Sequence, residues 1–151
     1  MSKLLEVLRG FSVTLWVGGL WAVGYLVAPS LFSILADNHV LAGALAGKLF
    51  RNIAWVGIAC GGFLLLQEIL SFRGKSVTRP VFWLVLLMLA ITCTMQFWLQ
   101  PFMVALRALG TPMDTLASPP IMRSFAFWHG ISSLLYLCES LLGLVLVLKS
   151  R

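Results

Sequence analysis

Residues 10–36 read GFSVTLWVGGLWAVGYLVAPSLFSILA, a run of 27 residues without a charged side chain. An α-helix rises about 1.5 Å per residue, so about 20 such residues cross the roughly 30 Å apolar core of a bilayer. Three further apolar stretches lie between Arg51 and Arg73, from Pro80 to Leu106, and between Arg123 and Lys149. The sequence therefore predicts an integral membrane protein with four transmembrane helices.

The composition of the whole chain also indicates that lipid is its solvent. Of its 151 residues, 60% are hydrophobic and 11% are charged, whereas soluble domains carry roughly 25% charged residues. Strands are excluded because the pattern does not alternate and four strands cannot close a barrel. We expect one all-α domain, residues 1–151, folded as a four-helix transmembrane bundle. Its helices are expected at about 8–36, 43–72, 80–107 and 122–148.

The formal net charge of +6 comes from basic residues that flank the apolar runs. At these positions they act as topology signals rather than as a nucleic-acid surface, so we expect no nucleic-acid partner. The side predicted to face the cytoplasm has seven of them: Lys3, Arg9, Arg73, Lys75, Arg79, Lys149 and Arg151. The other side has four: Lys48, Arg51, Arg107 and Arg123. The bias predicts a bacterial inner-membrane protein with both termini in the cytoplasm.

The sequence contains no complete catalytic or cofactor-binding motif. Nucleotide-binding loops, zinc-peptidase motifs and serine-hydrolase motifs are all missing from it. The three cysteines, Cys60, Cys93 and Cys138, lie in separate apolar runs, which is typical of packing residues. The chain is therefore predicted to be no enzyme, and neither a metal nor a cofactor is expected.

A polar stripe follows the last predicted helix at three-to-four-residue spacing: His129, Ser132, Ser133, Tyr136, Glu139 and Ser140. Glu139 precedes Lys149 by ten residues, which places it about 15 Å from the helix end. A carboxylate at that depth costs about 2.5–3.5 kcal/mol on insertion scales. Two interpretations stay open: a proton or cation site, or a neutral acid that bonds a neighbouring helix or reaches Arg9.

The third predicted helix offers Gln96 and Gln100, one turn apart and followed by Pro101. Proline removes a backbone hydrogen bond and favours a kink, which would widen the bundle at this point. Antiparallel packing of the last two helices would bring both amides to the depth of His129. The predicted cavity, open to the outer face, has six candidate residues: Gln96, Gln100, His129, Ser132, Ser133 and Tyr136. Plain helix–helix hydrogen bonding is the alternative use of these groups.

Small residues mark close helix packing in the first half of the chain. Gly43 and Gly47 form one Gly-xxx-Gly pair, and Gly57 and Gly61 form another. Such pairs let helix backbones approach each other in lipid. They predict a packing face that a homo-oligomer or a larger membrane complex could also use.

Several segments carry a resemblance to a known family. They are Leu15-Trp16-Val17-Gly18-Gly19, Ala28-Pro29-Ser30-Leu31-Phe32, Ala46-Gly47-Lys48-Leu49-Phe50, Trp98-Leu99-Gln100-Pro101 and His129-Gly130-Ile131-Ser132-Ser133-Leu134. In this order they resemble the transmembrane-protein-205-like family, which is similar in turn to the copper-resistance-D-like membrane superfamily. The resemblance implies a four-helix membrane protein without established enzyme activity. Eukaryotic relatives are associated with platinum-drug resistance and secretory trafficking, and the distant superfamily with copper and haem.

These observations lead to three functional hypotheses. The first is a non-enzymatic membrane protein that handles or exports a small solute or metal. The second is a structural or accessory subunit of a larger membrane complex. The third is a haem-linked redox protein, which would need an axial ligand such as methionine because His39 is the other histidine beside His129.

Overall fold

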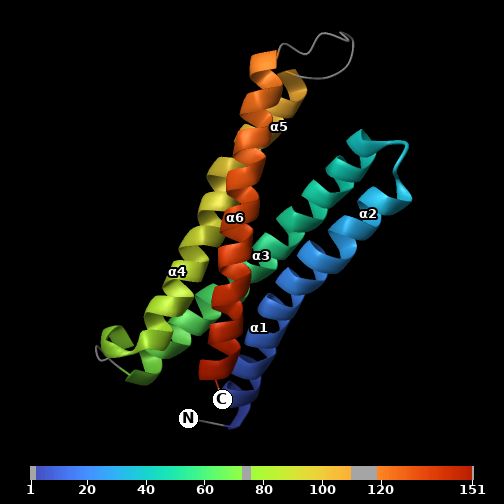
Figure 1. The fold of residues 1–151 in the computed structure, drawn as a ribbon. Coiled ribbons are helices and arrows are strands. Elements are labelled where there is room, and N and C mark those ends of the chain that lie inside the picture. Colours follow the sequence, from blue (N-terminus) through green and yellow to red (C-terminus); the bar gives the residue numbers. More distant parts are fainter. Residues whose placement is uncertain (1–2, 73–75, 110–118, 151) are drawn as a thin grey trace.

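A computed structural model describes residues 3–72, 76–109 and 119–150, and these ranges contain helices and no strand (Figure 1). Four helical stretches are long and apolar enough to cross a membrane: Lys3–Ile34, His39–Phe72, Pro80–Leu106 and Phe125–Lys149. The predicted four-helix transmembrane fold is therefore confirmed. The first two stretches begin five and four residues earlier than expected, at Lys3 and His39.

Two of the four crossings, the first and the third, are each divided into three elements. The first consists of α1 (Lys3–Trp21), the π-helical η1 (Ala22–Val27) and α2 (Ala28–Ile34). The second is α3 (His39–Phe72), and the 3-10 turn η2 (Ser76–Thr78) precedes the third. The third consists of α4 (Pro80–Thr94), the π-helical η3 (Met95–Leu99) and α5 (Gln100–Leu109), and the fourth is α6 (Pro119–Lys149).

Both chain termini lie at the same end of the bundle, drawn at the bottom in Figure 1. We call this the terminal end and the opposite one the distal end. Toward the distal end, α2 and α3 diverge from α5 and α6 in Figure 1. The bundle is therefore packed differently along its length, with all four crossings together only near the terminal end and the middle.

Each of the two π-helical turns immediately precedes a proline within a crossing. Pro29 follows η1 and Pro101 follows η3. A proline ring clashes with the carbonyl four residues earlier, here those of Tyr25 and Phe97, and both residues lie inside the π-helical turns. The wider turns make room for the rings, so helix continues beyond both prolines.

The hydrophobic core occupies the terminal half of the bundle and surrounds Trp16, which is fully buried. Its indole lies against Gly57 and Gly61 of α3. A Cβ atom at Gly57 would lie 2.5 Å from Trp16 Nε1, and one at Gly61 would lie 2.9 Å from Trp16 Cη2. This glycine pair thus receives a side chain of the same chain and forms part of the packing inside the bundle. Gly47, by contrast, has open space beside it.

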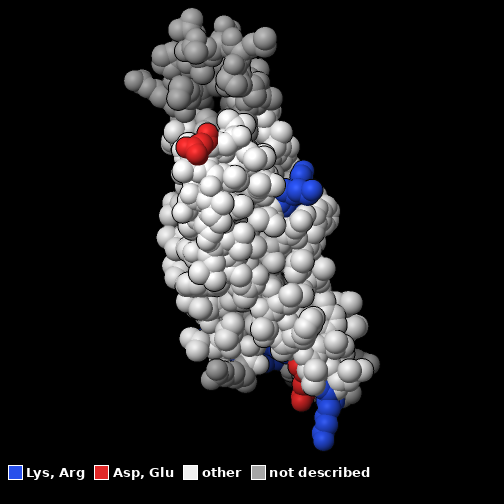
Figure 2. Space-filling model, turned by 90° about the vertical axis from the view of Figure 1, so that its right-hand side faces the viewer, with Lys and Arg blue, Asp and Glu red and all other residues white. Residues whose placement is uncertain are grey.

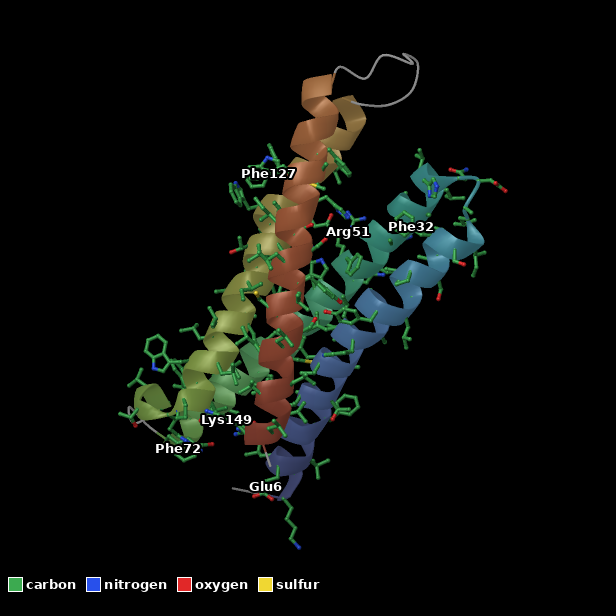
Figure 3. All side chains as sticks on the ribbon, in the orientation of Figure 1. Glu6, Phe32, Arg51, Phe72, Phe127 and Lys149 are labelled. Atoms are coloured by element: carbon green, nitrogen blue, oxygen red, sulfur yellow. The ribbon has the colours of Figure 1, made fainter. Side chains whose placement is uncertain are left out.

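Charged side chains lie toward the ends of the molecule. The face drawn in Figure 2 has acidic and basic groups near its two ends and an uncharged band between them. Glu6 and Lys149 lie at the terminal end, and Phe127, 64% exposed, points away from the bundle (Figure 3). Large hydrophobic side chains exposed in this way fit a surface that faces lipid.

Candidate functional site: a cavity between the four crossings

A cavity of about 40 Å³ lies at the distal border of the hydrophobic core. This volume has room for roughly three water molecules. Its lining comes from all four crossings: Trp16, Leu20, Phe50, Ile53, Ala54, Thr92, Met95, Gln96, Gln100, Tyr136 and Glu139. The η3 turn supplies Met95 and Gln96, so the irregular backbone before Pro101 forms part of its wall.

Glu139 is buried at this cavity and bonds to Thr92 of α4. The Thr92 hydroxyl oxygen lies 2.5 Å from Glu139 Oε1 and 3.0 Å from the Met88 carbonyl oxygen. A hydroxyl carries one proton and can also accept. Thr92 can therefore donate to an ionised Glu139, or accept from a protonated Glu139 while it donates to Met88. This hydrogen bond suits the carboxyl group in both of its charge states.

Within the part of the chain that the structure describes, two polar atoms of cavity-lining residues are buried without a hydrogen-bond partner. They are the indole Nε1 of Trp16, a donor, and Oε1 of Gln96, an acceptor. Gln96 is 8% exposed and Trp16 is fully buried. Leaving a buried polar group unsatisfied costs about 1–3 kcal/mol, and native structures rarely tolerate it without a reason. Both residues line the same cavity, whose accessible wall is otherwise mainly apolar.

Tyr136 closes one side of the cavity and ties α6 to the first crossing. Its hydroxyl donates to the Leu20 carbonyl oxygen at 2.6 Å. Its ring packs edge-on against Phe50, with ring centroids 5.1 Å apart, and against Gly24, where a Cβ atom would overlap it. The glycine in η1 thus permits the close approach that positions this tyrosine.

The structure brings some of the predicted site residues together and separates others. Gln96, Gln100, Tyr136 and Glu139 line the cavity, but His129, Ser132 and Ser133 do not. Glu139 bonds to the neighbouring helix, whereas Arg9 pairs with a different acid. Glu139 therefore contacts another helix rather than Arg9, whichever charge state its carboxyl group has.

His129 lies beyond the cavity, on the exposed distal part of α6. Its ring stacks on Phe125 of the same helix, with centroids 5.9 Å apart. The hydroxyls of Ser132 and Ser133 donate to the His129 carbonyl oxygen. The prediction of one cavity shared by these three residues and Gln96 is wrong, although α5 and α6 stay in contact. The first and second crossings, which supply the rest of the cavity wall, diverge from α6 at this level (Figure 1).

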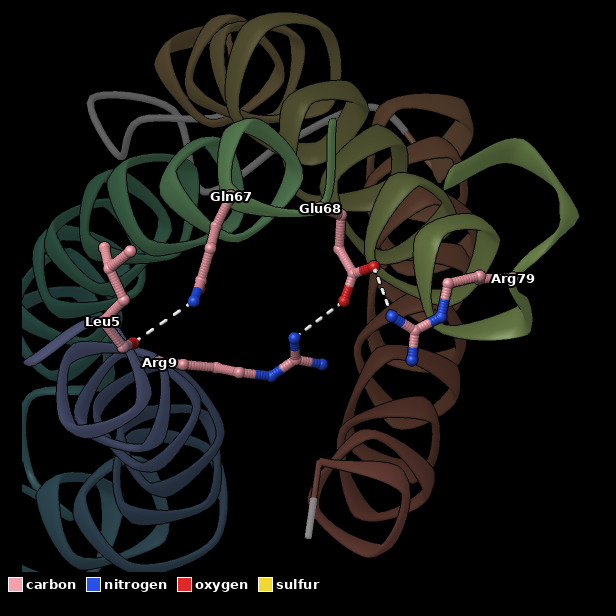
Figure 4. Close-up of polar contacts among 5 residues, drawn as sticks. All are labelled: Leu5, Arg9, Gln67, Glu68 and Arg79. Carbon is pink, nitrogen blue, oxygen red and sulfur yellow. Dashed lines mark hydrogen bonds and ion pairs between the residues drawn. The ribbon is translucent and has the colours of Figure 1, made fainter. Parts of the chain in front are cut away.

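Sequence reasoning missed an ion-pair cluster at the terminal end, which joins three segments of the chain (Figure 4). Glu68 of α3 is 1% exposed; its Oε1 lies 2.7 Å from Arg9 Nη1 and its Oε2 lies 3.5 Å from Arg79 Nη1. The Arg79 guanidinium also lies over the Phe72 ring, 3.8 Å from its centroid. The sequence does contain a feature that indicates this cluster, since Glu68 stands five residues before the basic segment that begins at Arg73. An acid at that depth needs a cation from a neighbouring helix.

Among the residues that the structure describes, no three His, Cys, Asp or Glu side chains are grouped closely enough to hold a metal ion. His39 stacks on Phe32 near the start of α3, far along the chain from the Phe125–His129 pair. Cys60 is buried in the core, whereas Cys138 is exposed. The described side chains thus offer hydrogen-bonding groups, the Met95 thioether and one carboxyl group at the cavity.

Comparison with known proteins gives one match. No curated protein and no solved structure matches this chain. The family described as domain of unknown function DUF4149 matches residues 11–112, which is 102 of the 151 residues. The matched range includes Trp16, Thr92, Gln96 and Gln100, and Glu139 lies outside it. Because the match covers well over half of its length, this four-helix chain belongs to the DUF4149 family.

Proposed function

We propose that this chain is a non-enzymatic membrane protein that binds a small polar solute in the cavity at the centre of its bundle. The unpartnered pair, Trp16 Nε1 and Gln96 Oε1, is the observation that carries this proposal. A core built only for packing would have these two groups bonded or replaced by apolar ones. A solute with both donor and acceptor atoms would satisfy both of them.

The size and lining of the cavity define the kind of solute. About 40 Å³ admits a molecule of only a few heavy atoms. No histidine or cysteine lines the cavity among the described residues, and the hydroxyl groups that line it are those of Thr92 and Tyr136. This lining supports binding rather than covalent chemistry. The resemblance to the transmembrane-protein-205-like family, associated with drug tolerance and trafficking, agrees with a role in solute handling.

Filling the cavity should abolish solute binding. Ala54 lines the cavity, so Ala54→Phe is expected to occupy most of its volume. A solute present at 100 times its Kd stabilises the native state by about 2.7 kcal/mol, which raises the Tm of the purified protein in detergent. We expect such a rise for the wild type with at least one of formamide, urea, glycerol or methylammonium chloride, and none for Ala54→Phe.

The matched control is Ala59→Phe, an exposed position on the same helix α3. This variant should respond to the solutes as the wild type does. Equal Tm values with and without every solute of the panel, for wild type and both variants, would refute the proposed function.

An accessory role in a larger complex is the second candidate. Gly10, Thr14 and Gly18 form an exposed stripe on α1, and a Cβ atom at either glycine would meet nothing within 4 Å. Such stripes suit a second transmembrane helix. The cavity experiment separates the two candidates, because a protein that serves only to pack against partners would show no dependence on small solutes.

We further propose that the chain resides in a bacterial inner membrane with both termini in the cytoplasm, based on the excess of basic residues at the terminal end. A reporter enzyme fused after Arg151 should be active only in its cytoplasmic form. The matched fusion within the Asp37–Asn38 segment, at the opposite end of α2, should be active only in its periplasmic form. The reverse pair of activities would show that the orientation is inverted.

A further inference from the structure

The cavity also points to the charge of its solute. We propose that it takes a small monovalent cation of the ammonium class, ammonium or a short primary amine, in exchange for the proton of Glu139. This inference rests on the proposed function, because it names the class of solute that the same cavity holds.

The first argument is electrical neutrality at membrane depth. Glu139 is 2% exposed and is the one acid among the described residues that line the cavity, and no lysine, arginine or histidine lines it. Tyr136, on the same helix, is the other titratable group of the lining. Arg9 and Arg79 are held by Glu68 at the terminal end and do not compensate Glu139. An uncompensated charge here is costly, so the carboxyl group is neutral either with a proton or with a bound monovalent cation.

The second argument is the proton count at Thr92. Its hydroxyl lies within hydrogen-bonding distance of both Met88 O and Glu139 Oε1 but has one proton to donate. With Glu139 protonated, the carboxyl donates to Thr92 and Thr92 donates to Met88. With Glu139 ionised, Thr92 turns its proton toward the carboxylate. The same heavy-atom positions therefore support both states, and an exchange of proton for cation needs no movement of the helices.

The third argument is the match between the remaining lining and an N–H cation. Gln96 Oε1 is an unpartnered acceptor beside the cavity, and it can accept one ammonium proton while the Glu139 carboxylate accepts another. Aromatic rings of Trp16, Phe50 and Tyr136 also line the cavity, and ring faces attract cations. A methylammonium ion has two heavy atoms, so it leaves room for a water that accepts from Trp16 Nε1.

The exchange balances in protons and charge. The cation R–NH3⁺ enters, the Glu139 O–H bond breaks, and the proton leaves to bulk water while the carboxylate and the cation form an ion pair. No covalent bond to the solute forms. One proton leaves for each cation bound, so the apparent affinity should rise by about tenfold per pH unit wherever the empty site is protonated.

The decisive measurement is proton release. Purified protein in weakly buffered detergent solution, with a pH indicator, is titrated with methylammonium chloride; sodium chloride and tetramethylammonium chloride are the matched salts. We expect about one proton released per protein with methylammonium, and a tighter apparent Kd at pH 7 than at pH 6. Tetramethylammonium, which has no N–H donor, should release none. Equal release with sodium would overturn the assignment to the ammonium class.

Variants test whether Glu139 is the exchanging group. Glu139→Gln keeps a hydrogen-bonding side chain next to Thr92 but cannot ionise, so it should lose both the proton release and the rise in Tm with methylammonium. The matched control, Glu6→Gln, changes an exposed acid on α1 and should behave as the wild type. If Glu139→Gln fails to fold, Glu139→Asp serves instead, and it should still release a proton but bind the amine more weakly. Unchanged proton release in Glu139→Gln would overturn the inference.

The outcomes also separate this inference from the proposed function. Stabilisation of the wild type by formamide or urea, without any effect of methylammonium, would refute the cation and leave the solute-binding cavity standing. Absence of stabilisation by every solute, equal in wild type and Ala54→Phe, would refute both.

Discussion

Replacing Glu68 with alanine should lower the free energy of unfolding by about 3–5 kcal/mol, the usual cost of removing one partner from a buried ion pair. Arg9 would lose its bond to a carboxylate that is 1% exposed (Figure 4). Its own side chain, 14% exposed, would remain largely buried without that partner. Thermal or detergent-induced unfolding of the purified protein, followed by circular dichroism, measures the loss.

Two controls give this result its meaning. Glu6→Ala removes an exposed acid at the same end of the bundle and should change stability by less than about 1 kcal/mol. The double variant Glu68→Ala with Arg9→Leu should recover part of the loss, because an apolar pair can replace a buried ion pair at little cost. If the unfolding midpoint of Glu68→Ala equals that of Glu6→Ala, the ion-pair cluster contributes nothing to stability.

Replacing Trp16 with alanine should be as damaging, at about 3–5 kcal/mol, because it opens a large void in the core. The indole is fully buried and fills the groove over Gly57 and Gly61. Neither α1 nor α3 can move to fill the void without also displacing the other helices that pack around the core. Unfolding of the purified variant in detergent would report the loss of stability.

Trp55→Ala is the matched control, since Trp55 is the same residue type on α3 but is 52% exposed. It should cost far less than Trp16→Ala in detergent. Similar losses for the two tryptophan variants would mean that the core around Trp16 packs more loosely than the structure shows.

The terminal half and the middle of the bundle have different chemical roles. The terminal half is closed by the hydrophobic core and, nearer its end, by the Arg9–Glu68–Arg79 cluster. The cavity begins where this core stops, at Trp16, Thr92 and Glu139. On this arrangement a solute would reach the cavity more readily from the distal side, where the crossings diverge (Figure 1).

The number and type of the crossings followed from the sequence because they depend on local properties. A run of about 20 uncharged apolar residues becomes a helix in lipid whatever its neighbours are, since its backbone hydrogen bonds have no other partner there. Glu139 could be recognised as a buried acid for the same reason, because its depth depends only on its distance along the helix from Lys149. The helix ends were less certain, since polar flanking residues continue a helix as readily as they end it.

The composition of the cavity was decided only by the tertiary structure. His129 and Gln96 have similar depths in the sequence, but depth does not say whether the first two crossings still cover α6 at that level. The divergence of the crossings leaves His129 exposed, while the indole of Trp16, in which the sequence shows no polar role, becomes part of the cavity wall. Likewise, the choice of Glu68 rather than Glu139 as the partner of Arg9 depends on how the helices are rotated and where they cross. These features are set by side-chain packing between segments far apart in the chain, and no local pattern encodes it.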